Sequence, residues 1–410
     1  MLTLVPWSDE HNTPANLVVR LPLAAVPMTR FPLPRMRPRP RFERPARHLK
    51  RRSVNLGGSD YEIRPYHPGD LECFLDLFEQ VFERRDPSWF EWKYEQNPFF
   101  DHVPIIVAFD ADVLVGARCF LPMRMRHGST TSIAIQPCDT MVHPDHRRRG
   151  LMTWMTRHAM RRYVEEASFF FNTPNTAALE ANRKLGWRIV TTIPTFYRIE
   201  SMQPQVPTPV KPVAELTDPL LALYRSIQDR NVELPHDIQI ERRATVPAQL
   251  LADLATESRP TTIHAERDIT FFNWRYENPM WTYTTYLAWR DSRLVGAMVT
   301  GTGESDAGTM TNLVDLLPLP APPVPTIDAL LAAVIQDHQL TDVFAVLGGS
   351  LASDMLERHG FIPDSMPLIA PFFNTLTLAA RPLRDTWVFD GRALDCASDW
   401  TFSLAERDTS

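Results

Sequence analysis

The sequence has few of the features that mark metal-binding, secreted or membrane-spanning chains. Its 410 residues include only four cysteines, which lie far apart and form no CxxC pair. This spacing disfavours a zinc site, so we expect no metal ion and four reduced thiols. The longest apolar stretch near the start, Leu17 to Phe31, is interrupted by two arginines and two prolines. Such a stretch is neither a membrane span nor a signal sequence, which predicts a cytoplasmic protein.

Positive charge is scarce outside the first 52 residues. That segment holds 11 Lys and Arg residues against 3 Asp and Glu residues, and the remaining chain holds 32 against 46, a net charge of −14. An acidic body repels phosphate groups, which argues against a nucleic-acid partner unless the basic segment binds one. The segment from Arg30 to Arg52 is rich in proline and arginine and lacks periodicity, so we expect it to be disordered.

Hydrophobic periodicity in the rest of the chain predicts a mixed α/β fold. The expected elements are, in order, a strand at 61–64, helices at 71–81 and 89–94, strands at 104–108, 114–125 and 132–142, a helix at 150–166, a strand at 169–171, a helix at 176–185 and closing strands through Tyr197. Strands and helices thus alternate in the second half of this unit, which is typical of a sheet with helices packed against it.

Three short motifs recur later in the chain in the same order. The segment 90–98 recurs as 272–279, one residue shorter, and the Leu-Val-Gly-Ala segment at 114 recurs at 294. The Lys-Leu-Gly-Trp segment at 184 has a counterpart in Arg-His-Gly-Phe at 358, so the three offsets are 182, 180 and 174 residues. Such regular offsets predict a tandem duplication of one fold, with a proline-rich connection after Met202.

A basic loop at 142–152 lies between a predicted strand and a predicted helix. It reads Val-His-Pro-Asp-His-Arg-Arg-Arg-Gly-Leu-Met. The first turn of a helix carries unsatisfied N–H groups and partial positive charge, and the three arginines add more charge. Gly150 lets the backbone approach a ligand closely. The loop therefore suits a pyrophosphate group.

This loop resembles the acetyl-CoA signature R/Q-x-x-G-x-G/A of the GNAT (GCN5-related N-acetyltransferase) superfamily. Met152 replaces the final glycine or alanine, in a form similar to that of Eis-type tandem GNAT enzymes. The resemblance implies that the strand backbone pairs with pantetheine and that the loop amides hold the pyrophosphate of acetyl-CoA. The residues implied in donor binding are Met141, Val142, His143, Arg147, Arg148, Arg149, Gly150, Leu151 and Met152, with Asn172 and Asn175 from a second motif.

The second motif, 171–187, resembles the GNAT segment N-x-x-x-x-x-x-Y-x-K-x-G-F. The family's tyrosine, which protonates the departing CoA thiolate, would fall at Asn182, and an amide cannot donate a proton in that way. Tyr197 is the candidate replacement acid, with a packing role as the alternative. Asp139, on the strand expected to line the acyl group, is the candidate base, and a structural carboxylate is the alternative.

The second copy has a different segment where the first has its basic loop. Residues 318–325 contain five prolines, which lack the N–H groups that a phosphate cradle needs. We therefore expect this copy to be inert and to pack beside the first, with its Trp274 and Tyr276 region shaping the acceptor pocket or the wall between domains. The expected organisation is a disordered segment at 1–57, a GNAT domain at 58–200, a linker with a helical connection at 201–265, a degenerate GNAT-like domain at 266–380 and a C-terminal tail at 381–410.

These features together predict an N-acetyltransferase with a tandem GNAT fold. An amine or hydroxyl of a small-molecule or glycan acceptor would attack the acetyl-CoA thioester directly, with strand amides holding the oxyanion. One alternative is a non-catalytic acyl-CoA-binding or scaffold protein, which Asn182 and the altered second copy favour. The other is a Fem-type transferase that uses aminoacyl-tRNA, against which the intact loop at 147–150 argues.

Overall fold

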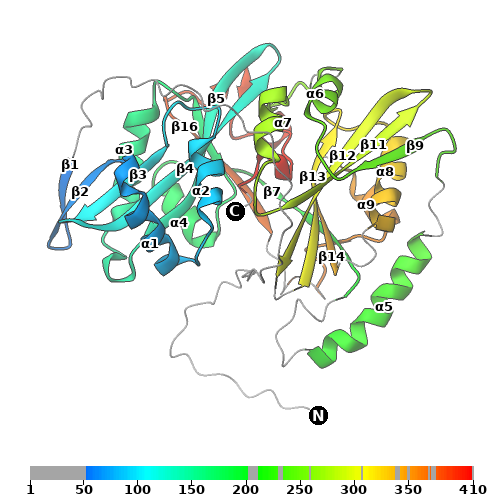
Figure 1. Ribbon diagram of the computed structural model, residues 1–410, viewed down its shortest axis with the longest axis horizontal. Coiled ribbons are helices and arrows are strands. Elements are labelled where there is room, and N and C mark those ends of the chain that lie inside the picture. Colours follow the sequence, from blue (N-terminus) through cyan, green and yellow to red (C-terminus); the bar gives the residue numbers. More distant parts are fainter. Residues whose placement is uncertain are drawn as a thin grey trace.

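The computed structural model describes residues 52–201, 211–229, 234–257, 260–305, 308–337, 342–348, 351–367, 370 and 375–408. Two large sheets lie side by side, each with helices against it (Figure 1). This arrangement confirms the mixed α/β fold class. No helix among these residues is both long enough and apolar enough to cross a membrane.

The first sheet is formed mainly by the N-terminal half. Its strands lie in the order β1 (Arg52–Leu56), β2 (Ser59–Pro65), β3 (Ile105–Asp110), β4 (Val113–His127), β5 (Thr130–Val142), β6 (Phe169–Asn172), β16 (Leu376–Pro382) and β7 (Arg188–Ile193), with the short β10 (His264–Ala265) added at β4. The pairs are antiparallel except β5 with β6. The helical elements of this half are α1 (Leu71–Val81), α2 (Pro87–Phe90), the π-helical turn η2 (Glu91–Glu95), α3 (Leu151–Tyr163) and α4 (Thr176–Arg183).

The second sheet repeats this order with later strands. It runs β15 (Ile362–Pro363), β8 (Thr195–Ile199), β14 (Val343–Leu347), β13 (Gly308–Leu317), β12 (Arg293–Ser305), β11 (Thr282–Arg290) and β9 (Gln239–Arg243). Its helices are α5 (Lys211–Asp229), α6 (Ala248–Thr256), α7 (Ile269–Arg275), α8 (Val324–Asp337) and α9 (Ser353–Arg358). As in the first sheet, a parallel pair, β13 with β14, follows an antiparallel run. The shared order is compatible with the predicted duplication.

The two halves exchange one strand each. β8 follows β7 in the chain but pairs with β14 and β15 of the second sheet. β16, from near the C-terminus, pairs between β6 and β7 of the first sheet. The sequence-based boundary at residue 200 therefore places β8 in the wrong sheet. An apolar strand pattern predicts a strand but does not indicate which sheet that strand will join.

The C-terminal region is also packed, in contrast to the predicted tail at 381–410. After β16 the chain forms β17 (Val388–Phe389) and β18 (Arg392–Ala393), and then buries Trp400, Phe402 and Leu404 in the main core. At the other end, β1 pairs with β2, so residues 52–56 are a strand rather than part of the predicted disordered segment. Residues 1–51 lie outside the described residues.

The largest hydrophobic core joins the two halves through their repeated motif. Trp92 of η2 stacks on Trp274 of α7, with ring centroids 5.7 Å apart and planes 12° from parallel. Each indole N–H donates to the other residue's carbonyl oxygen, at 2.8 Å from Trp92 and 3.0 Å from Trp274. The repeated residues thus meet across a local twofold arrangement. Their contact supports the prediction that this region forms the wall between the halves.

Candidate active site

The central feature of the first sheet is an irregularity in the pairing of β5 with β4. Ala117 of β4 pairs with Met141 and Cys119 pairs with Cys138, so Asp139 and Thr140 form a bulge opposite Arg118. Asp139 has φ of 37°, which a non-glycine residue adopts only where the surroundings require it. Bulges of this kind often lie next to active sites, because they redirect side chains and interrupt pairing.

On its other edge β5 pairs with β6 over only a short distance. The parallel register consists of Ala134 with Phe169 and Ile135 with Phe170. Beyond Ile135, β5 has no strand partner on this edge among the described residues. Its backbone from Pro137 to Val142 is therefore an edge without a described strand partner, although Arg147 Nε donates to the Val142 carbonyl oxygen at 3.2 Å. An extended ligand with amide groups could pair with such an edge.

The N-terminus of α3 begins at Gly150, as the loop motif predicts. Gly150 has φ of 86°, a left-handed conformation that favours glycine, and no side chain caps the first turn. The first-turn amides are thus available for a ligand. Arg147 and Arg148 are exposed beside them. Arg149 is less exposed, and its guanidinium donates to the hydroxyls of Ser59 and Tyr61, both at 3.0 Å.

The predicted donor-binding residues around the loop differ in how far their side chains are buried. The side chains of Met141 and Leu151 are buried in hydrophobic clusters, whereas Val142 and Met152 are partly exposed. His143 accepts a hydrogen bond from the Asp145 amide at 3.3 Å and so orders the turn after β5.

The two predicted asparagines of the second motif have different surroundings. Asn175 caps α4, where its side-chain oxygen accepts from the Ala178 amide at 2.9 Å. That oxygen is therefore engaged in holding the helix. Asn172, buried at the end of β6, has a side-chain oxygen without a hydrogen-bond partner in the structure. A buried carbonyl without a partner is costly, so Asn172 remains the better candidate for contact with a ligand.

On the side of β5 that faces η2, Asp139 belongs to a buried ionic network. The ammonium of Lys93 lies 2.5 Å from the Asp139 carboxylate and 2.7 Å from that of Asp408. The Tyr94 hydroxyl also donates to Asp139. Burial alone would lower the pKa of Lys93, but the two carboxylates reverse this effect and raise it above its ordinary value. The structure therefore brings Asp139 together with a cation and a second acid.

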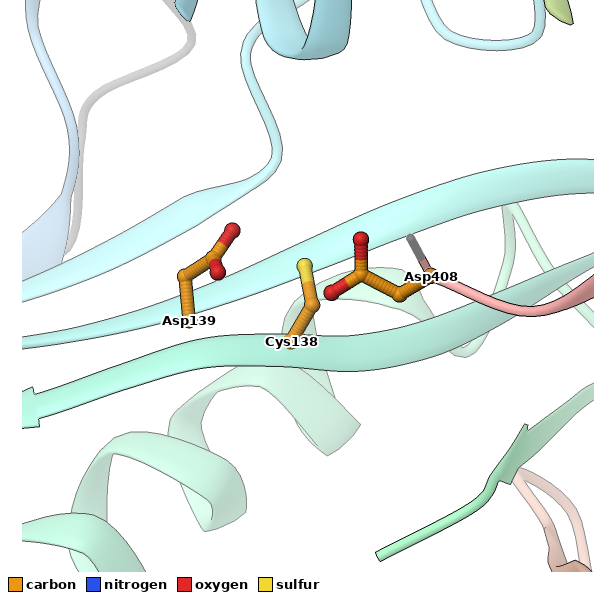
Figure 2. A group of neighbouring side chains, drawn as sticks. All are labelled: Cys138, Asp139 and Asp408. Carbon is orange, nitrogen blue, oxygen red and sulfur yellow. The ribbon is translucent and has the colours of Figure 1, made fainter. Parts of the chain in front are cut away.

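Asp408 reaches this network from the far end of the chain. Figure 2 shows Asp408 approaching Cys138 and Asp139 of β5. Two contacts with Gln136 of β5 hold the segment, since the Asp408 amide donates to the Gln136 side chain at 2.5 Å and Gln136 donates to the Glu406 carbonyl at 3.0 Å. Sequence analysis did not identify Asp408, because its partner Lys93 is distant in the sequence and no local motif around Asp408 indicates the contact.

The same three residues have a geometry that could hold a metal ion. One ligand atom from each of Cys138, Asp139 and Asp408 lies within 4.8 Å of the others. The Lys93 ammonium, however, already contacts both carboxylates and supplies the positive charge that a metal would bring. Burial also raises the pKa of the Cys138 thiol well above its usual value, which disfavours the thiolate that binds metals. We therefore treat the cluster as an acid and lysine network.

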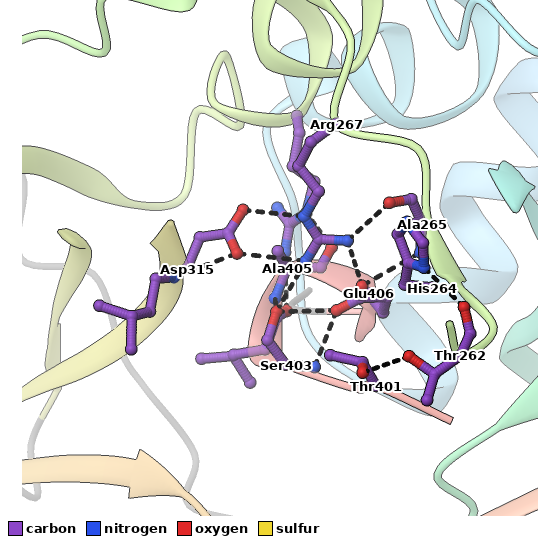
Figure 3. Close-up of polar contacts among 12 residues, drawn as sticks. Thr262, His264, Ala265, Arg267, Asp315, Thr401, Ser403, Ala405 and Glu406 are labelled. Atoms are coloured by element: carbon purple, nitrogen blue, oxygen red, sulfur yellow. Dashed lines mark hydrogen bonds and ion pairs between the residues drawn. The ribbon is translucent and has the colours of Figure 1, made fainter. Parts of the chain in front are cut away.

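The second half has a related buried cluster of charged residues, in which an arginine pairs with two acids. Asp315 of β13 accepts from the Tyr276 hydroxyl at 3.2 Å, as Asp139 accepts from Tyr94. Figure 3 shows Arg267 between Asp315 and Glu406, with its guanidinium 3.1 Å from the Asp315 carboxylate. Glu406 comes from the same C-terminal segment as Asp408. Residues 403–408 thus pass the cluster of the second half and end at that of the first.

The candidate acid Tyr197 lies on a different sheet from Asp139. It belongs to β8 and packs with Ile199, Leu221 and Ile362 on the second sheet. Burial raises the pKa of its hydroxyl, and a hydrogen bond with Thr195 lowers it in part. Its role as an acid stays a prediction, and the packing alternative agrees with its apolar neighbours.

With the strand order, the bulge and the start of α3 described, the chain can be compared with known proteins. Residues 62–190 match the family model of the acetyltransferase (GNAT) domain. The chain therefore carries a GNAT acetyltransferase domain, as the resemblance of its loop implied. No curated protein matches the sequence.

Solved structures of similar fold extend the likeness beyond residues 62–190. A GCN5-related N-acetyltransferase from Anabaena variabilis shares 12% identity and a TM-score of 0.54, over 79% of this chain and 73% of that one. A probable N-acyltransferase from Enterococcus faecalis shares 10% identity and a TM-score of 0.55, over 79% and 72%. Eis1 from Mycobacterium abscessus, at 14% identity and 79% and 73% coverage, has a TM-score of 0.46, too low to support an argument. At these identities the likeness concerns the fold alone.

Proposed function

We propose that this chain is an N-acetyltransferase that uses acetyl-CoA as its donor. The observation that supports this most strongly is the edge of β5 that has no strand partner after Ile135 in the described part of the chain. This edge includes the bulge at Asp139 and precedes the uncapped N-terminus of α3. The strand edge offers backbone amides to an extended donor arm, and the start of α3 offers first-turn amides to a pyrophosphate.

In this proposal the two ends of the donor have separate contacts. The pyrophosphate lies on the amides after Gly150, with the exposed Arg147 and Arg148 adding positive charge. The pantetheine arm follows the backbone of Met141 and Val142 toward the bulge. There the thioester would meet the acid network of Asp139 and Asp408.

The acceptor would enter from the side of the Lys93 network. Its amine nitrogen forms a bond to the thioester carbon, the carbon–sulfur bond breaks, and the electron pair of that bond leaves with sulfur. The amine proton passes to one of the two carboxylates, Asp139 or Asp408, which Lys93 holds in place. Backbone amides at the bulge would stabilise the oxyanion. The negative charge of the site attracts a protonated amine, which first loses its ammonium proton to solvent so that the neutral nitrogen attacks.

Calorimetric titration with acetyl-CoA tests the donor. We expect micromolar binding by the wild type and a loss of at least about tenfold in affinity in an Arg148→Glu, Gly150→Asp variant, because both changes place negative charge at the phosphate site. Arg161→Glu, an exposed charge reversal in the last turn of the same helix, is the matched control and should bind as the wild type does. Circular dichroism establishes that all three proteins fold.

The possible results separate the candidate functions. An absence of acetyl-CoA binding by the folded wild type overturns the proposal. Binding without turnover on a panel of primary amines and hydroxyl compounds selects a non-catalytic acyl-CoA-binding protein, which the asparagine at position 182 favours. Equal weakening in the loop variant and in the Arg161→Glu control would show that charge anywhere on α3 matters and would remove the loop from the donor site.

A further inference from the structure

Arg118 is a buried arginine without an acidic partner. Its side chain on β4 is 2% exposed, and no ion pair joins it to a carboxylate in the part of the chain that the structure describes. It donates to the Thr140 hydroxyl and, at 3.4 Å, to the side-chain oxygen of Asn182. Its Nε and the Asn182 side-chain nitrogen have no hydrogen-bond partner. A buried charge so poorly matched costs stability, which points to a use outside folding.

The electrostatic state of Arg118 reflects this setting. Burial lowers the pKa of its guanidinium to about 10, and only the neighbouring cysteines raise it slightly. The group is nonetheless protonated at neutral pH, so it presents a positive charge in a poorly solvated place. A charge there acts on a nearby ligand more strongly than it would in water.

Arg118 lies opposite the bulge and on the donor side of β5. The bulge residue Asp139 contacts Lys93 of η2, whereas the next residue, Thr140, contacts Arg118 and through it Asn182 of α4. Phe120, two residues along β4, packs in the cluster that includes the buried face of α3. The guanidinium therefore shares its face of the sheet with the helix whose N-terminus would hold the pyrophosphate.

We propose that Arg118 contacts the sulfur atom of the acyl donor and stabilises the thiolate that departs. This inference rests on the proposed function. The acceptor nitrogen and the departing sulfur occupy opposite sides of the thioester carbon, as Asp139 and Arg118 occupy opposite sides of the bulge. The carbon–sulfur electron pair stays on sulfur, whose negative charge the guanidinium offsets. No proton transfer to sulfur is needed in this step, which suits a site where Asn182 cannot supply one.

A cation beside a thiol favours its thiolate, and this effect can be measured by binding alone. CoA carries the thiol, and desulfo-CoA has the same arm and pyrophosphate without it. We expect the affinity ratio of CoA to desulfo-CoA for the wild type to rise with pH, reaching about tenfold for each unit by which the bound thiol's pKa falls. In Arg118→Met that rise should disappear, while desulfo-CoA binds within about twofold of the wild type.

The stability of the variant distinguishes this role from a structural one. Because Arg118 lacks a carboxylate partner, Arg118→Met should melt at the same temperature as the wild type or higher. Absorbance of the bound thiolate in the ultraviolet should likewise titrate at lower pH in the wild type than in the variant. If Arg118→Met does not fold, Arg118→Lys, which keeps a cation, should retain part of the pH-dependent preference.

Each result supports or overturns the inference. Equal weakening of CoA and desulfo-CoA in Arg118→Met would show that the arginine serves the arm or the framework and not the sulfur. A wild type that binds desulfo-CoA but shows no preference for the thiol at any pH overturns this inference and leaves the proposed function in place. A folded wild type that binds neither compound overturns both.

Discussion

Replacement of Lys93 by methionine tests how much the buried network depends on the lysine that contacts both of its acids. The lysine side chain is fully buried, and its partners Asp139 and Asp408 keep side-chain exposures of 9% and 19%. Removal of one member of a buried ion pair costs about 3–5 kcal/mol, because the remaining charge has neither water nor partner. Since water still reaches both acids in part, we expect a loss near the lower end, about 3 kcal/mol in the free energy of unfolding.

The change in stability with pH provides a second, independent test of this prediction. The raised pKa of Lys93 means that its contribution is present below the ordinary lysine value, about 10.4, and is lost only as pH rises through the folded value. In Lys93→Met the two carboxylates lie close together without the cation between them, and they repel each other when both are ionised. The variant should therefore lose stability as pH rises above about 4, so its deficit grows between about pH 4 and about pH 7.

Urea unfolding followed by circular dichroism measures both effects. The double variant Lys93→Met, Asp139→Asn is the matched control, because it removes one of the two stranded charges and should recover part of the loss. The reasoning is refuted if Lys93→Met unfolds within about 0.5 kcal/mol of the wild type, the usual range for a surface change. A deficit that is constant with pH would also count against it, since simple loss of packing has no such dependence.

Three further predictions follow from the exchange of strands and from buried polar groups. A fragment of residues 52–201 lacks β16 between β6 and β7 and should show no cooperative thermal transition; a cooperative one would contradict this. Trp92→Phe and Trp274→Phe each remove one indole hydrogen bond and should lower the free energy of unfolding by similar amounts, about 1 kcal/mol; clearly unequal losses in urea would refute the symmetry. Burial lowers the pKa of His359, so its contribution is present above about pH 6.5 and is lost on acidification; His359→Gln should flatten the melting temperature between about pH 5 and pH 7, and an unchanged profile would refute this.

The sequence predicted the donor loop better than the side chains around it. Gly150 at the start of α3 follows from a local rule, because a left-handed residue before an amphipathic helix has a recognisable pattern. The direction of Arg149 and the capping role of Asn175 do not, since each depends on which neighbour lies within reach after folding. The proposed partner of the sulfur, Arg118, also escaped sequence reasoning, because an arginine in a strand is ordinarily a solvated residue.

By itself the sequence determined the elements of the first half, the position of the basic loop, the mixed fold class and the repeat of its motifs. These features are encoded locally, in periodicities of 2 and 3.6 residues and in the residues that begin and end helices. Only the tertiary structure decided that β8 and β16 change places and that Asp408 joins Asp139 and Lys93. The physical reason is that backbone edges of different strands offer the same hydrogen-bonding groups, so their pairing is chosen by the packing of the whole chain.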